Sequence, residues 1–152
     1  MNRSPQKLSK RRIAEIQILR AIKVLVEDED PVSAITLAGA AEEIIGKKLR
    51  DKGKRCAFDH AVAFGKQVLA FAAEELQIRG RSIEVPAEAE LKERVNRTRN
   101  ELKHKCTDKP VVAHFPDEAE SMIVRALNNY VILYGRPPRQ KYVQSWYEHM
   151  TL

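Results

Sequence analysis

The sequence predicts an all-α protein: an antiparallel bundle of four to five long helices followed by a short C-terminal helix. Apolar residues recur at three- and four-residue spacing along nearly the whole chain, while alternation of period two is almost absent. Residues that start and stop helices punctuate this pattern at short intervals. At 152 residues the chain has the size of one domain. We therefore expect a single domain over 1–152, with its core over about 8–134 and a basic, aromatic extension over 135–152.

The helices are predicted in order from their periodicity and their caps. A first helix over about 8–27 is broken by "EDED", after which Asp30 is a good N-cap and Pro31 a good first helical residue. Gly80 and Gly135 are placed to end two later helices. The expected elements after the first are a second helix to about 52, a third over 56–79, a fourth from Pro86 through "AEAELKERVNRTRNELKHK", a fifth over 116–134 and a short last one in "QKYVQSWYEHM".

The second helix carries a stripe of small residues that would let a neighbouring helix approach closely. At about 100° per residue, one side of this helix gathers Ala34, Ala38, Ala41, Ile45 and Leu49. Glu42 and Glu43 interrupt the apolar pattern. We expect them to pair at i, i+4 spacing, Glu43 with Lys47, and a catalytic role for the two carboxylates is the alternative.

Charge and targeting signals narrow the choice of partners and compartment. The net charge of +6 comes with basic clusters at 7–12, 47–55, 97–105 and 136–141, a distribution that favours nucleic acids or other phosphate-bearing partners. The apolar runs stop short of the ~20 residues of a membrane span, and the basic N-terminus leads into a charged amphipathic segment rather than an apolar signal region. The sequence thus predicts a cytoplasmic protein.

The cysteines and histidines follow no metal-binding pattern. Cys56 and Cys106 fit a reducing compartment, and a single disulfide between them stays open as the alternative. No zinc-ribbon spacing, Gly-rich phosphate loop or H-E-x-x-H motif is found. We therefore expect neither a metal nor a cofactor.

The fourth predicted helix has two distinct sides. Taking Leu91 as zero, a narrow apolar stripe within about 40° consists of Leu91, Val95, Thr98 and Leu102. Arg97, Asn100 and His104 fall on the side away from this stripe, and Arg99 falls nearer its flank. Folding explains the stripe but leaves this polar side, in "NRTRNELKHK", without a structural role.

These polar residues are the parts needed to cleave RNA without a metal. Histidine exchanges protons near neutral pH, arginine matches phosphate oxygens, and asparagine can orient a hydroxyl or phosphate oxygen. RNA supplies its own nucleophile, the ribose 2′-OH. The alternative is an ordinary solvated helix face whose contacts, such as Glu93 with Arg97, are plain surface pairs.

The stretch "RNELKH", Arg99 through His104, resembles the R-x(4–6)-H motif of the HEPN superfamily, and "RTRNELKH", from Arg97, fits the longer spacing. The resemblance implies a helical bundle that often dimerises. Many HEPN domains are metal-independent ribonucleases of toxin–antitoxin, phage-defence or RNA-processing systems. Others have lost catalysis and serve as protein- or RNA-binding modules. Both alternatives stay open at this point.

Carried to this chain, the resemblance makes Arg99 and His104 the catalytic pair and Asn100 the polar residue that follows the arginine. Helical geometry offers Arg97 as the alternative arginine. Lys103 and Lys105 are expected to contact nucleic acid. The expected partners are RNA, a second copy of the chain docked through the face bearing Arg97, Asn100 and His104, and a cognate antitoxin or nucleotidyltransferase-like protein.

Overall fold

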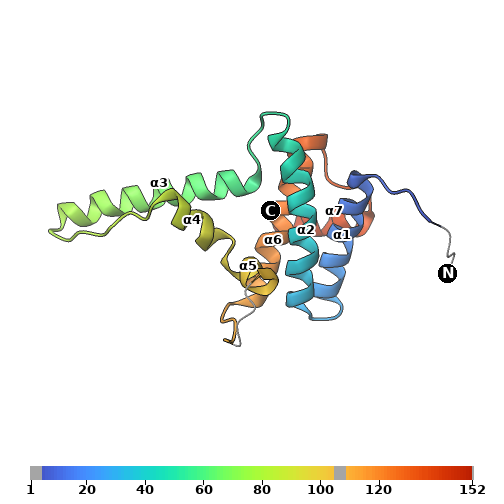
Figure 1. The fold of residues 1–152 in the computed structure, drawn as a ribbon, viewed down its shortest axis with the longest axis horizontal. Helices are drawn as coiled ribbons and strands as arrows, with labels where there is room; N and C mark the ends of the chain where they lie inside the picture. The colour runs from blue at the N-terminus through green and yellow to red at the C-terminus, as the bar shows by residue number, and fades with distance from the viewer. Residues whose placement is uncertain (1–4, 105–108, 152) are drawn as a thin grey trace.

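Three helices form the centre of the fold (Figure 1): α1 (Lys10–Val26), α2 (Pro31–Arg50) and α6 (Phe115–Tyr134). The computed structural model describes residues 5–104 and 109–151, with the backbone alone for His104 and Thr151. Every element in these ranges is helical and none is a strand, so the predicted all-α class is confirmed. α2 lies between α1 and α6 and has its most extensive contacts with these two helices.

The caps form as the sequence predicts. Asp30 accepts a hydrogen bond from the Ser33 N–H at 2.9 Å, directly before Pro31 at the start of α2. Gly135 ends α6 in the left-handed region, with φ of 74°. A residue with a Cβ adopts that conformation only at a cost, so glycine suits this C-terminus.

The core is built on the small-residue stripe of α2. All five residues of that stripe are essentially inaccessible to water, as predicted. The last helix, α7 (Lys141–Thr151), closes the same core: Val143 is fully buried, and Tyr142, Trp146 and Tyr147 pack against it. The aromatic residues of the C-terminal extension therefore contribute to the core of the bundle.

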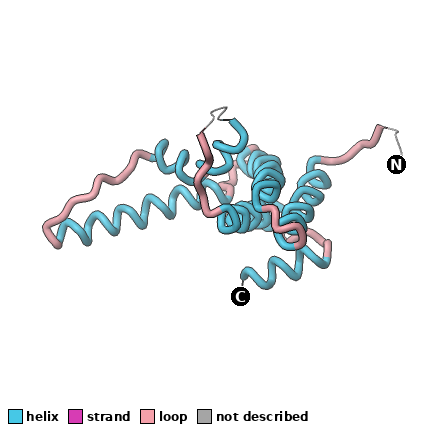
Figure 2. The backbone as a smooth tube through the Cα atoms, turned by 90° about the horizontal axis from the view of Figure 1, so that it is seen from below, coloured by secondary structure: helices cyan, strands magenta, loops and turns pink. Residues whose placement is uncertain are grey.

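The next two helices form an arm. In Figures 1 and 2, α3 (Ala57–Ile78) projects away from the bundle, residues 79–87 return beside it without a helix, and α4 (Glu88–Val95) lies against it. The buried Asn129 of α6 anchors the base of the arm, because its Oδ1 accepts a hydrogen bond from the Ala57 N–H at 2.6 Å. Within the described ranges, neither this 22-residue helix nor any other is long and apolar enough to cross a membrane.

The single helix predicted from Pro86 to Lys105 is wrong, because the structure divides it. α4 ends at Val95, Asn96 adopts φ −111° and ψ 9°, and α5 (Arg97–His104) begins at the next residue. Arg125 of α6 donates to the Val95 carbonyl at 3.3 Å and to Asn96 Oδ1 at 3.0 Å. Asparagine readily leaves the helical conformation, and Arg125 stabilises the break with these two bonds.

Candidate functional site

A polar cavity of about 390 Å³ opens where α2, the base of α3 and α5 meet. We call it the motif cavity, since Arg99 and Asn100 of the predicted motif both line it. Its other lining residues are Glu42, Glu43, Arg50, Phe58 and Asn96. Two of the four predicted catalytic residues thus share one cavity, together with the two carboxylates that interrupt the apolar pattern of α2.

Arg99 is held tightly inside this cavity. Its Nη2 lies 2.5 Å from Glu43 Oε2, its Nη1 lies 3.8 Å from Glu42 Oε2, and its side chain is only 11% exposed. The side chain lies over Gly39 of α2: a Cβ built at Gly39 would be 2.9 Å from Arg99 Nε. The absence of a side chain at position 39 therefore lets the arginine approach α2.

Glu42 is a buried carboxylate shared between two arginines. Besides Arg99, its partner is Arg125, whose Nη2 lies 3.3 Å from Glu42 Oε1. A buried charge is costly unless it is paired, and here two guanidinium groups compensate it. This pairing connects α2 to both α5 and α6.

The predicted pairing of Glu43 with Lys47 is wrong. Lys47 pairs with Asp51 at 3.5 Å, whereas Glu43 faces Arg99 and Lys103, whose Nζ lies at 3.6 Å. The tertiary contact is made because α5 packs across α2 and brings two cations to the carboxylate. Helical spacing within α2 gives no sign of this contact.

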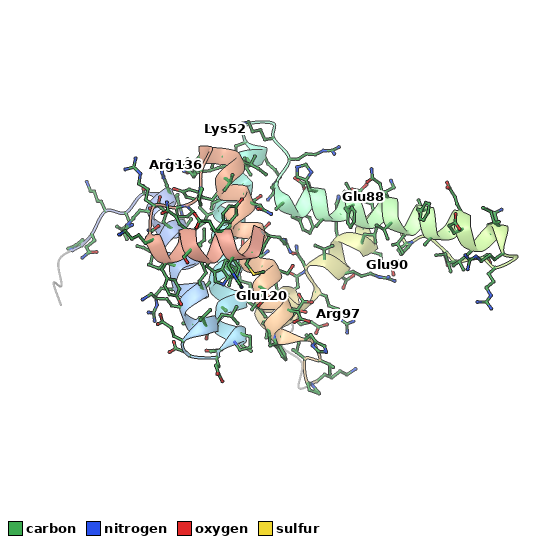
Figure 3. The ribbon with its side chains drawn as sticks, turned by 180° about the vertical axis from the view of Figure 1, so that it is seen from behind. Lys52, Glu88, Glu90, Arg97, Glu120 and Arg136 are labelled. Carbon is green, nitrogen blue, oxygen red and sulfur yellow. The ribbon has the colours of Figure 1, made fainter. Side chains whose placement is uncertain are left out.

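Arg97 lies outside the motif cavity. Its side chain is 66% exposed and pairs with Glu101 one turn along α5, at 3.1 Å from Nε to Oε1. Figure 3 shows it on the outer side of the helix. Its predicted position assumed a helix continuous from Leu91, which the break at Asn96 invalidates. Of the two candidate arginines, only Arg99 lines the cavity.

Of the other predicted site residues, His104, Lys103 and Lys105, the structure describes only a part. His104 is the last residue of α5, one turn after Asn100, and its side chain lies outside the described residues, as does all of Lys105. Lys103 is described, and its contact with Glu43 partly balances its charge. Of the predicted apolar stripe, Leu91 and Thr98 are buried, while Val95 and Leu102 are half-buried.

A second cavity, of about 360 Å³, joins two basic clusters that lie far apart in the sequence. We call it the arginine cavity. It is lined by Ser9, Arg11, Arg12, Glu15, Arg136 and Arg139. Figure 3 shows Arg136 at the end of the bundle where α1 begins. Both clusters are recognisably basic in the sequence, but only the packing of the α6–α7 connection against α1 brings them together.

One arginine of this cavity is fixed by a network. Arg11 Nε lies 3.0 Å from both Glu15 Oε1 and the Tyr130 hydroxyl, and its guanidinium lies 4.4 Å from the centre of the Tyr134 ring. Burial and the hydrogen bond to Glu15 raise the pKa of Tyr130 to about 12. Burial opposes ionisation of Glu15 as well, but the bonds from Tyr130 and Arg11 outweigh it, so the pKa of Glu15 lies below its usual value.

One cysteine, Cys56, lies among the described residues, directly before α3. Cys56 is a buried free thiol that contacts Arg50 at 3.0 Å and Asp59 at 3.1 Å, and burial raises its pKa. The predicted alternative of a disulfide to Cys106 concerns a residue outside the described ranges. Within those ranges, no three His, Cys, Asp or Glu side chains gather in a way that could hold a metal ion.

Comparisons of the chain with models of protein families, with curated proteins and with solved structures find no match. The resemblance to HEPN domains therefore rests on the motif residues and the helical layout. The motif cavity and the arginine cavity are the two features of the structure that suggest a function.

Proposed function

We propose that this chain is a HEPN-like protein that binds RNA at the motif cavity and cleaves it without a metal. The observation that supports this most is the joint position of Arg99 and Asn100 in one cavity that also contains Arg50. His104 follows Asn100 by one turn of α5, the spacing at which helical residues are neighbours. Arg99, Asn100 and His104 are the motif residues that the resemblance selects.

Each residue has a role that its chemistry suits. The two carboxylates hold the Arg99 guanidinium in place, so that it is ready to stabilise the charge that grows on a phosphate. Asn100 orients the ribose or a phosphate oxygen. The 2′-oxygen bonds to the adjacent phosphorus as the 2′-OH proton passes to His104, while the bond from phosphorus to the 5′-oxygen breaks and that oxygen takes a proton from water. His104 is the group that transfers a proton in this step, and the product ends in a 2′,3′-cyclic phosphate.

The arginine cavity supplies affinity for the RNA backbone. It is lined by four arginines and one carboxylate, and Arg136 and Arg139 pair with no carboxylate among the described residues. Each phosphate neutralised by such a cation releases counterions, so binding weakens as salt rises. We expect RNA to make non-specific phosphate contacts there.

The test is incubation of the purified protein with a labelled RNA oligonucleotide in EDTA, followed by analysis of the ends by mass spectrometry. We expect cleavage that survives EDTA, leaves 2′,3′-cyclic phosphates, and falls at least ~100-fold in His104→Ala. The matched DNA oligonucleotide lacks the 2′-OH and should stay intact. Undiminished cleavage by His104→Ala, at equal folded fraction, would refute the proposed role of His104.

The second candidate function is a non-catalytic RNA- or protein-binding module. The observation that favours it is the pairing of Arg99 with Glu42 and Glu43, since an arginine neutralised in this way also serves simply to hold α5 on α2. This candidate predicts that the wild-type protein binds the RNA oligonucleotide or a protein partner but leaves the RNA uncut in the same assay.

A further inference from the structure

The protruding helix α3 has two apolar sides, and the structure covers only one of them. On the covered side, Val62 is buried and lines a cavity together with Lys66 of α3 and Glu88 of α4. On the other side, large apolar side chains face water, with Phe64 67%, Phe71 65% and Ile78 81% exposed. Val68 lies between the two phenylalanines and is also exposed. We call Phe64, Val68, Phe71 and Ile78 the α3 stripe.

The spacing of the stripe is that of a helix-pairing seam. Its members and Glu75 follow one another at steps of four, three, four and three residues, which is the heptad spacing of coiled coils. At about 100° per residue, the stripe clusters around Phe64 while Val62 and Lys66 lie about 160° away. The covered and exposed sides are therefore nearly opposite, so that α4 cannot reach the stripe.

We propose that the α3 stripe is the interface with a second copy of this chain, formed by antiparallel pairing of two α3 helices. In a two-fold arrangement centred on Phe71, Phe71 packs against its own copy and Phe64 packs against Ile78 of the other chain. Glu75 then lies opposite the Gln67 amide. A parallel arrangement in register would set Glu75 against Glu75 within the seam, where like charges repel, so the charges favour the antiparallel form.

The area available is sufficient for a specific dimer. A buried phenylalanine covers about 150–250 Å², so the two-thirds exposed phenylalanines of two copies remove roughly 500 Å² from water. Val68 and Ile78 of both copies, with the flanking side chains, bring the interface to the ~1,000 Å² that a specific contact needs. Each copy contributes about half of this area, which matches the largest apolar patch of a typical monomer, and such patches often mark binding sites.

This interface differs from the one that the HEPN resemblance implies. The stripe lies on α3, opposite the side that packs on α4, whereas the implied interface lies on α5 with Arg97 and His104. The proposed α3 interface does not depend on RNA cleavage, because the observations that support it are the exposure and the spacing of the residues in the α3 stripe. Variants on the two surfaces therefore separate the two arrangements.

The test is the mass of the full chain in solution by sedimentation equilibrium. We expect the wild type to be a dimer and Phe64→Glu/Phe71→Glu to raise the dimer dissociation constant at least ~100-fold, with unchanged circular dichroism because both side chains already face water. Arg97→Glu and Val32→Glu are the matched controls on exposed sites elsewhere, and both should remain dimeric. A monomeric wild type, or a dimer that survives the double substitution, would overturn the proposal.

The register has its own test in a Cys106→Ser background, where the remaining Cys56 is buried. On mild oxidation, Phe71→Cys should link two copies, while Phe64→Cys alone should not. Phe64→Cys combined with Ile78→Cys should link them again. Efficient linking through Phe64→Cys alone would show a parallel pair and contradict the antiparallel arrangement.

Discussion

Gly39 determines how closely the Arg99 side chain approaches α2. Because a Cβ at this position would come within 3.1 Å of two atoms of Arg99, a larger residue must displace a side chain that two carboxylates hold in place. The glycine thus has a role that helix propensity alone would argue against, since alanine is favoured by about 1 kcal/mol inside a helix.

We predict that Gly39→Ala lowers the free energy of unfolding by about 1 kcal/mol or more despite this gain in propensity. The control is Gly46→Ala in the same helix, where the nearest atom, Asn129 Nδ2, would be 3.4 Å away. The free energy of unfolding of Gly46→Ala should equal or exceed that of the wild type. Urea unfolding measures both, and equal stabilisation of the two would show that Arg99 is free to move.

Glu15 makes the stability depend on pH in a defined direction. Its pKa is lower in the folded protein than its ordinary value of 4.5, so its contribution is complete above that value and is lost as the pH falls through the folded pKa. The stability difference between the wild type and Glu15→Gln should therefore be largest above about pH 4.5 and should shrink as the pH falls below that value. Urea unfolding at several pH values measures this difference, and one that stays constant with pH would exclude a contribution from Glu15.

At the scale of elements, most helices were predictable because the residues that begin and end them lie next to them in the sequence. The predicted boundaries of the first, second, third and fifth helices agree with the structure to within two residues. The break at Asn96 was not predictable, because the bonds that stabilise it come from Arg125, some thirty positions along the chain. The same limit applies to Glu42 and Glu43, whose partners lie on α5 and α6.

Arg125 of α6 contacts Glu42 of α2 and also the break between α4 and α5. We therefore expect it to be the main link between the helices around the motif cavity. We predict that Arg125→Met lowers the free energy of unfolding by about 3 kcal/mol, because it leaves Glu42 buried with only its longer contact to Arg99. Adding Glu42→Leu removes the unpaired carboxylate and should recover part of this loss. Chemical unfolding of the single and double variants measures the coupling, and strictly additive effects would contradict it.

At the scale of the whole molecule, composition and periodicity gave the class of fold but not its shape. On α3, Val62 of the covered side is buried. The exposure of Phe64 and Phe71 on its other side was not predicted from the sequence. Periodicity shows that a side of a helix is apolar, but it does not show whether the rest of the chain covers that side. Likewise, the two basic clusters were visible in the sequence, while their meeting in the arginine cavity depends on the fold.

We propose that RNA cleavage takes place in the motif cavity rather than on the outer face of α5. Cleavage of the RNA oligonucleotide in EDTA by Asn100→Ala and Arg97→Ala, at equal folded fraction, tests it most directly. The two residues lie three positions apart on one helix, but only Asn100 lines the cavity. We predict that Asn100→Ala slows cleavage about 100-fold and that Arg97→Ala stays within about threefold of the wild type. A larger loss in Arg97→Ala than in Asn100→Ala, or no cleavage by the wild type, would contradict the claim.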